Sequence, residues 1–190
     1  MIHDPRSKIQ EGGFTLIETL VVALVTVMLA AIMIVYSHTG EKQIALFRDQ
    51  AKVVGILNRT KFLSVQMFSK TPITQTSIDV PCAYGVHFNN DGKDFLIFKD
   101  LKTDPNQSCT SGNHNNKYDS GELFEQYSLD QRLKFQTNLS DVVFIPPDPE
   151  VILTGTSDNP AKIFLIDISD TSGKNKKEVD VNTFGQITTQ

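Results

Sequence analysis

Residues 12–36, GGFTLIETLVVALVTVMLAAIMIVY, constrain this chain more than any other stretch. From Thr19 to Tyr36 the only polar groups are the two threonine hydroxyls, at 19 and 26, and the Tyr36 hydroxyl. A helix rises about 1.5 Å per residue, so about 20 apolar residues cross the hydrocarbon core of a bilayer. The sequence therefore predicts one membrane-spanning helix, followed by a domain outside the membrane.

The composition fits a membrane segment with one further domain. The chain has 190 residues and a net charge of −4, and it contains no Trp and no internal repeat. A mildly acidic chain has no general field that would attract nucleic acid. These numbers favour a single acidic domain attached to the apolar helix.

Glu18 is the one carboxylate of the apolar stretch. A carboxylate within a spanning segment costs about 3 kcal/mol unless it finds a partner. One interpretation places it close enough to the interface to reach water and headgroups. The other is that the charge awaits a cation from another subunit.

The segment GGFTLIETLVV resembles the class III signal of type IV pilins and of type II secretion pseudopilins. The resemblance implies that a prepilin peptidase removes residues 1–13 by cutting between Gly13 and Phe14. Phe14 would then be the N-methylated mature N-terminus. Glu18 would be its fifth residue, which in this family pairs with the N-terminal amine of a neighbouring subunit.

The same resemblance implies a location and a set of partners. We expect a single-pass protein of the cytoplasmic (inner) membrane whose C-terminal domain lies outside the cytoplasm and later joins a periplasmic or cell-surface filament. Its partners would be the prepilin peptidase, other pilin or pseudopilin subunits and the inner-membrane assembly platform.

The helix is predicted to continue well beyond the membrane, because no proline occurs between Phe14 and Lys70. Residues 14–36 form the spanning or filament-core part. Residues 37–70 are amphipathic, with Leu46, Val53, Val54, Leu57, Val65 and Phe68 near one face. Thr71-Pro72 ends the helix, since the residue before a proline disfavours helical geometry.

Residues 71–190 read as short strands separated by turns, which predicts an α+β fold: a long helix packed on an antiparallel β-sheet domain. Asn90-Asp91-Gly92 is a hairpin turn signal, and 171–177 reads as a polar turn with three solvated lysines. The expected strands are 78–80, 84–88, 95–99, 123–128, 132–137, 142–145, 151–153, 162–168, 178–183 and 186–188.

A narrower resemblance spans most of the chain. NHNNKYDSGELF at 113–124, the later VVFIPP segment and GQI near the end are similar to the GspH/FimT group of minor pseudopilins and minor pilins. In that group a loop closing in D-x-G-E precedes a strand. The resemblance implies the pilin-like α+β fold.

Cys82 and Cys109 are the only cysteines. In an oxidising compartment they can form one bridge, which closes a loop of about 28 residues and contributes about 3 kcal/mol. Two free buried thiols are the alternative, and we favour the disulfide.

The loop at 111–122 can be aligned with a twelve-residue calcium loop, with Ser111, Asn113, Asn115, Asp119 and Glu122 at ligand positions. Only two carboxylates are present and an Asn takes the glycine position. We therefore favour a turn at Asp119-Ser120-Gly121 and expect no cofactor, with calcium as the weak alternative.

FimT-like minor pilins suggest DNA capture, carried by arginines in a C-terminal Gly-Arg-x-Arg pattern. Here the residues are Gly185-Gln186-Ile187-Thr188, so both arginines are missing. Phosphate contacts need Lys or Arg, and nucleic-acid binding is not expected. The four histidines lack metal-ligand spacing and no nucleophile elbow is present, so no enzyme is expected.

The sequence thus predicts a structural subunit, a minor pilin or pseudopilin. Two alternatives stay open: a ligand- or DNA-binding subunit at a fibre tip, and an anchored protein that never polymerises.

Overall fold

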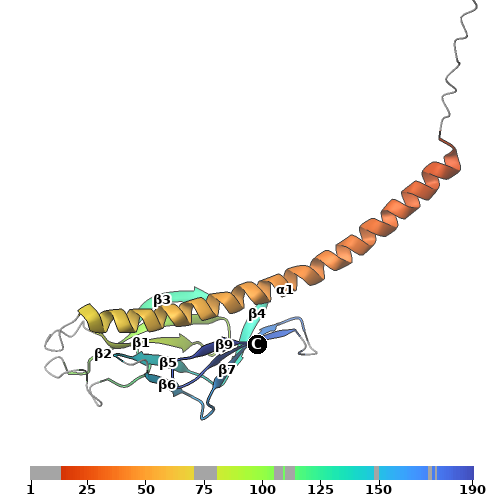
Figure 1. Ribbon diagram of the computed structural model, residues 1–190. Coiled ribbons are helices and arrows are strands. Elements are labelled where there is room, and N and C mark those ends of the chain that lie inside the picture. The colour runs from red at the N-terminus through yellow and green to blue at the C-terminus, as the bar shows by residue number, and fades with distance from the viewer. Residues whose placement is uncertain are drawn as a thin grey trace, which may run out of the picture. The chain divides into compact units, whose positions relative to one another are not determined.

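The computed structural model describes residues 14–70, 81–104, 109, 114–147, 150–170, 173 and 175–190. The fold is α+β, as predicted: helix α1 (Leu16–Lys70) precedes strands that all pair antiparallel (Figure 1). This arrangement is compatible with a pilin-like fold. The chain divides into two compact units between Glu41 and Lys42.

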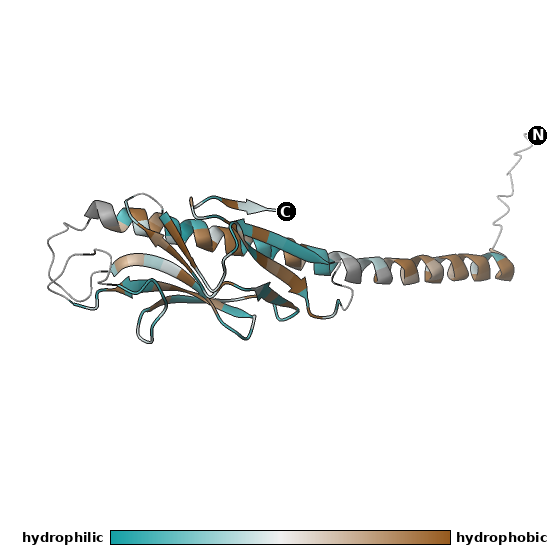
Figure 2. Cartoon of the chain, turned by 90° about the horizontal axis from the view of Figure 1, so that it is seen from below, coloured by the Kyte–Doolittle hydropathy of each residue, from teal (hydrophilic) through white to brown (hydrophobic). Residues whose placement is uncertain are grey.

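The first unit is the apolar part of α1. Its 19 residues Leu16–Ile34 are long and apolar enough to cross a membrane, and none of them is buried within the protein. Most of this part of the helix is brown in Figure 2, the colour of hydrophobic residues. The hydroxyls of Thr19 and Thr26 donate to the carbonyls of Leu16 and Ala23, at 2.9 and 2.8 Å. Both hydroxyls are thus satisfied within the helix, as a lipid environment requires.

The second unit contains two antiparallel sheets. Sheet A has the strand order β3-β2-β1-β5-β6, and sheet B has the order β4-β7-β8-β9. The strands are β1 (Pro81–Phe88), β2 (Asp94–Leu101), β3 (Leu123–Ser128), β4 (Leu133–Thr137), β5 (Asp141–Ile145), β6 (Glu150–Thr154), β7 (Ala161–Asp167), β8 (Lys176–Val181) and β9 (Ile187–Thr189).

The β1–β2 hairpin forms at the predicted turn. Gly92 has a φ of 72°, a conformation that glycine adopts without strain. The Asp91 carboxylate accepts hydrogen bonds from the amides of Lys93 and Asp94, at 2.9 and 3.2 Å. These two bonds lower the pKa of Asp91, because they stabilise its charged form.

The core lies between the second half of α1 and one face of each sheet. The buried residues of α1 are Ala45, Leu46, Val53, Ile56 and Leu57. They belong to one cluster with Val86, Phe95 and Phe144 of sheet A and with Phe135, Ile163, Leu165 and Val179 of sheet B. The predicted apolar face is confirmed at Leu46, Val53 and Leu57, whereas Val65 is exposed.

The other face of sheet A carries a second, smaller core. Ala83, Leu96, Phe98 and Val143 are buried there, and the loop before β3 covers them with Tyr118. The Tyr118 ring lies 5.7 Å from the Phe98 ring, centroid to centroid. The central strands of sheet A are therefore apolar on both faces, which explains their nearly continuous burial.

The structure differs from the sequence prediction at two of the three lysines expected in the polar turn at 171–177. Lys176 and Lys177 belong to β8 and pair with Ile166 and Leu165, instead of lying in a turn. Their ammonium groups lie over aromatic rings, so the long apolar stems suit a strand position. The other strand predictions inside the described ranges are confirmed, and the one at 78–80 falls outside them.

The close packing of Gly85 generates a stability prediction. A methyl group on Gly85 would overlap the Phe98 ring and lie 3.1 Å from the carbonyl oxygen of Val142. Gly85→Ala should lower the free energy of unfolding by about 2 kcal/mol, because the buried ring has no room to move. Urea denaturation followed by circular dichroism measures the change.

Gly55→Ala is the matched control. Gly55 is an exposed helical position with no atom within 4 Å of an added Cβ. This substitution should raise stability by up to about 1 kcal/mol, since Ala favours a helix over Gly. Equal effects of the two substitutions would contradict the close packing at Gly85.

Candidate functional site

Thr15 begins α1 as its N-cap. Its hydroxyl accepts a hydrogen bond from the amide of Glu18 at 3.4 Å, and its carbonyl accepts from the amides of Glu18 and Thr19. Thr15-Leu16-Ile17-Glu18 also matches the capping-box pattern, Ser or Thr followed three residues later by Glu. The structure shows the Thr15 half of this pattern, the bond from the Glu18 amide to the Thr15 hydroxyl. Sequence reasoning on the charge of Glu18 missed this cap, although the spacing was visible.

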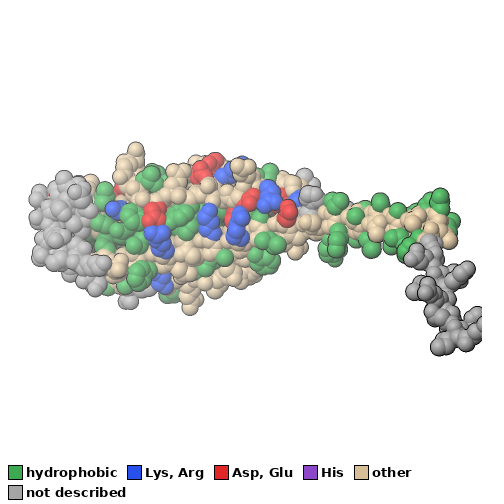
Figure 3. All heavy atoms as spheres, turned by 90° about the horizontal axis from the view of Figure 1, so that it is seen from above, with side chains coloured by type: hydrophobic (Ala, Val, Ile, Leu, Met, Phe, Trp, Pro, Cys, Tyr) green, Lys and Arg blue, Asp and Glu red, His purple; other side chains and the backbone are tan. Residues whose placement is uncertain are grey.

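Glu18 therefore lies in the first turn of the helix, where a negative charge suits the helix dipole. Its side chain is exposed, and so are those of Phe14, Leu16 and Ile17 around it. No described residue donates a hydrogen bond to its carboxylate. Figure 3 shows apolar side chains along this part of α1. The predicted cleavage position includes Gly13, which lies outside the described residues.

Cys82 and Cys109 form the predicted disulfide, with their Cα atoms 5.2 Å apart. The bond joins the start of β1 to the long connection between β2 and β3. Because the two residues are 27 apart in the sequence, the bond restricts much of that connection in the unfolded chain.

A buried histidine–carboxylate pair also attaches the β2–β3 connection to strand β2. Nδ1 of His114 lies 3.0 Å from Oδ2 of Asp100, and the two side chains are 6% and 1% exposed. The same Asp100 oxygen accepts the amide of Asn116 at 3.0 Å. Asp100 raises the pKa of His114, although burial opposes this, because the carboxylate favours the charged imidazole.

The predicted turn at 119–121 is present. The amide of Glu122 donates to the carbonyl of Asp119 at 3.1 Å, and Gly121 has a φ of 107°. Oε1 of Glu122 accepts the amide of Leu101 at 2.9 Å, and Oε2 accepts the amide of Asp119 at 2.9 Å. The D-x-G-E residues thus connect β2, the loop and β3.

This bonding uses the oxygens proposed as calcium ligands. Nδ2 of the Asn115 side chain donates to Oδ2 of Asp119 at 2.6 Å, and Oδ1 of Asn115 accepts the amide of Lys117 at 2.9 Å. Both carboxylate oxygens of Glu122 accept the backbone amides named above. Ser111 and Asn113 lie outside the described residues. Within the described ranges, no cluster of three His, Cys, Asp or Glu side chains is arranged to hold a metal.

His87 lies on the face of sheet A that Tyr118 covers. Its Nδ1 is 2.8 Å from Oδ1 of Asp141, which joins β1 to β5, and its ring lies 4.9 Å from the Tyr118 ring. The sequence predicted a surface or capped histidine, and the contact with Asp141 explains its position.

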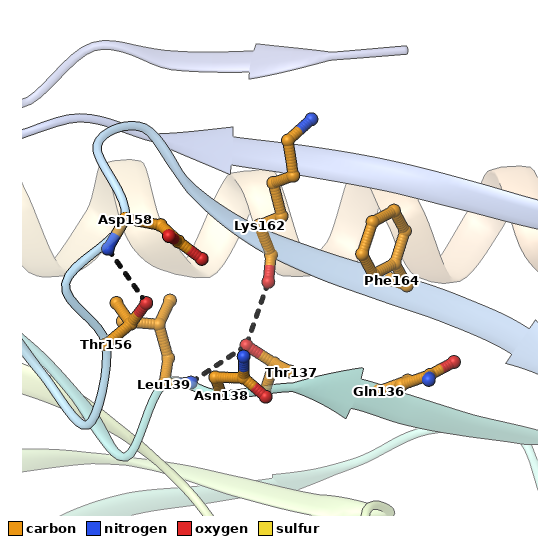
Figure 4. A pocket seen from close by; sticks show the side chains of 8 residues that line it. All are labelled: Gln136, Thr137, Asn138, Leu139, Thr156, Asp158, Lys162 and Phe164. Atoms are coloured by element: carbon orange, nitrogen blue, oxygen red, sulfur yellow. Dashed lines mark hydrogen bonds between the residues drawn. The ribbon is translucent and has the colours of Figure 1, made fainter.

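A separate polar cleft of about 190 Å³ lies between β4, β7 and the loop that precedes β7 (Figure 4). Its walls include Gln136, Asn138, Thr156, Asp158 and one edge of Phe164. The Lys162 ammonium extends away from it toward β8, where it bonds Glu178. The cleft offers amide and carboxylate groups beside an aromatic ring.

The C-terminal segment aligned with the DNA-binding pattern forms a tight turn. Gly185 has a φ of 71°, and its carbonyl accepts a hydrogen bond from the Lys61 ammonium at 2.9 Å. Oδ1 of Asn182 accepts the amides of Phe184 and Gln186. The turn is thus attached to α1 and leads into β9.

The His114–Asp100 pair predicts a pH-dependent stability. Because the folded-state pKa of His114 is raised, the pair's contribution is complete below the ordinary histidine value of about 6.5. It is lost as the pH rises through the higher folded-state value. We expect His114→Gln to lower the free energy of unfolding by about 2 kcal/mol in acid and by less above neutral pH.

The measurement is the difference between native protein and variant in urea denaturation at a series of pH values. Glu122 also titrates nearby, since burial and the neighbouring carboxylates raise its pKa. Glu122 is present in both proteins, so the difference in stability between them reports mainly the removal of His114. A difference that stays constant from acid to alkaline pH would contradict the charged pair.

Comparison of the chain with protein-family models, with curated proteins and with solved structures finds no match. What the structure itself shows is an apolar N-terminal helix long enough to span a membrane, an antiparallel β domain packed on the second half of that helix, and one disulfide.

Proposed function

We propose that this protein is a structural subunit, a minor pilin or pseudopilin, of a type IV pilus-like filament. The observation that carries the proposal is Glu18: an exposed carboxylate in the first turn of a helix whose next 16 residues are exposed and almost entirely apolar. Such a helix needs either lipid or other apolar helices around it. A carboxylate there needs a cation.

A second subunit supplies that cation if the leader is removed. Cleavage between Gly13 and Phe14 would create a new amine one residue before the Thr15 cap. An amine and a carboxylate that are each costly in an apolar environment stabilise one another when neighbouring subunits bring them together. The resemblance of GGFTLIETLVV to class III signals supports this route.

This proposal also gives a role to residues 1–36 and to the β domain. The prepilin peptidase and an inner-membrane assembly platform act on residues 1–36 while the protein is anchored. The β domain, which resembles the GspH/FimT group, lies outside the cytoplasm and then on the filament. The proposed subunit needs no cofactor.

Gly13→Leu tests the leader. A large side chain at this position should block the peptidase, because the resemblance places the cleaved bond directly after Gly13. Immunoblots of cells that express the peptidase should then show only a precursor, heavier by the 13-residue leader. Cleavage at an unchanged rate would rule out this processing site.

Glu18→Val tests the pairing. The substitution removes the charge and leaves an apolar side chain, so membrane insertion should be unchanged while incorporation into filaments falls at least about tenfold. Fractionation of membranes and sheared filaments measures both quantities.

Thr26→Val is the control for this experiment. It also makes the apolar segment more uniform, but it leaves Glu18 in place, so incorporation should stay normal. Native-level incorporation of Glu18→Val would remove the basis of the pairing proposal.

A second candidate is a ligand-binding subunit at the filament tip. The polar cleft with Gln136, Asn138 and Asp158 favours it. DNA is a poor candidate for this ligand because the segment 185–188 has no arginine. A salt-dependent gel shift with the protein would support DNA binding, and its absence would leave the cleft as the place to look for another ligand.

A further inference from the structure

The second half of α1 is apolar on two opposite sides. One side is the buried stripe that packs against both sheets. The other is exposed, and its members recur every three or four residues, so that at about 100° per residue they centre on the side opposite the buried stripe. We call this exposed side the outer stripe. It consists of Ile44, Phe47, Ala51, Gly55, Phe62 and Val65.

The outer stripe itself carries no charge, and the arginines beside it are bonded within their own domain. Arg48 lies 3.2 Å from Asp49 and 2.9 Å from Asp130, and Arg59 lies 2.5 Å from Glu125. Figure 3 shows hydrophobic side chains among Lys and Arg side chains on this face. A surface without unpaired charge can face an identical copy of itself without repulsion, as an isologous contact requires.

Lys177 lies at the border of the outer stripe. Its ammonium is 4.1 Å from the centre of the Phe47 ring, on the side where Gln43 and Leu46 also line a hollow. The ring remains 55% exposed. The ammonium therefore flanks the outer stripe and does not interrupt it.

The middle of the outer stripe suits the close approach of a second helix. Ala51 and Gly55 are one turn apart, and an added Cβ at Gly55 would meet no atom within 4 Å. Small residues at this spacing let two helix backbones come close together. Asn58 lies on the same side, and its Nδ2 donates to the carbonyl of Val54 at 3.0 Å, which leaves Oδ1 available. A single Asn between two paired helices fixes their register.

The exposed area is large enough for a specific contact. Ile44, Phe47, Phe62 and Val65 are 69%, 55%, 62% and 44% exposed. A fully exposed large apolar side chain presents roughly 200 Å². Two facing outer stripes therefore bury up to about 1,000 Å² in total, which is the lower limit for a specific interface.

Anchoring determines which partner orientation is possible. The candidate span Leu16–Ile34 precedes the outer stripe in the same helix. Two copies anchored in one bilayer enter it with the same end, so their α1 helices run parallel. The bilayer also confines the copies to one plane and raises their effective concentration.

From these observations we propose that two membrane-anchored copies of this chain pair through their outer stripes. The pair is parallel and isologous, with Ala51 and Gly55 of each copy at the helix crossing and the β domains on the outside. This inference rests on the membrane-anchored state of the proposed function. The pair precedes assembly, because the contacts of a helical filament are heterologous and bring different residues together.

A cysteine cross-link tests the pairing. The full-length Ala51→Cys variant is purified and reconstituted alone into liposomes with a large excess of lipid, and the native cysteines stay occupied in their own disulfide. Copper phenanthroline should then produce a covalent dimer on a non-reducing gel, because a two-fold axis brings residue 51 of both copies within bridging distance. Gln43→Cys is the control: it is also exposed on α1 but lies beside the outer stripe, and it should give little dimer.

Gly55→Leu and Gly55→Ala form a matched pair in the Ala51→Cys background. Both favour a helix over glycine, and the chain leaves room at this position. The leucine should lower the cross-linked fraction about tenfold, since it keeps the backbones apart, whereas the alanine should change it less than about twofold. Circular dichroism confirms that each variant is folded.

Three results would overturn the inference: no dimer from Ala51→Cys, equal dimer from Gln43→Cys, or equal effects of the two Gly55 substitutions. A dimer that forms only after other filament subunits are added would also overturn it and would assign the outer stripe to a different chain. Leader processing and filament incorporation are read separately. Normal assembly without the cross-link would refute only the pairing, whereas a cross-linked protein that never enters filaments would refute the proposed function.

Discussion

The burial of one stripe of α1 is the contact on which the second unit depends. Sheets A and B are separate hydrogen-bonded ladders, and Leu46, Val53 and Leu57 fill the space against both of them. Each buried aliphatic side chain contributes about 2 kcal/mol. The helix is therefore the shared core of two sheets that would otherwise each expose an apolar face.

Polar groups of α1 give this packing its register. The side-chain amide of the buried Gln50 donates to the carbonyl of Glu178 in β8 and to that of Gln190, which follows β9, at 2.8 and 3.3 Å. Ser64 donates to the carbonyl of Phe144 in sheet A at 2.6 Å. Oδ2 of Asp49 accepts the amide of Asp130 at 2.6 Å. Apolar burial alone would permit sliding along the helix, and these directional bonds select one position.

Local patterns predicted the local structure well. The apolar run, the absence of proline up to Lys70, the Asn-Asp-Gly turn and most strands depend on neighbouring residues, and the structure has them. The distribution of strands over two sheets could not be predicted, because it depends on pairing between distant segments such as β1 with β5. Burial of the second face of sheet A depends likewise on the return of Tyr118 from a distant loop.

In the candidate sites, too, features that depend on nearby residues were predictable and features that depend on distant contacts were not. The cysteine pair and the turn at Asp119 were predictable from residue type and spacing. The Asp100–His114 pair was not, because neither residue has a neighbour in sequence that suggests the other. Lys176 and Lys177 were misplaced because two consecutive lysines resemble a solvated loop, while the aromatic rings beneath them come from α1 and β7.

The continuity of α1 has a mechanical consequence. One helix, Leu16–Lys70, contains both the exposed apolar segment and the stripe packed between the sheets. Within the second unit, the buried residues of α1 belong to one cluster with side chains of both sheets. Detaching this part of the helix would therefore expose apolar faces of sheet A and sheet B in the same step.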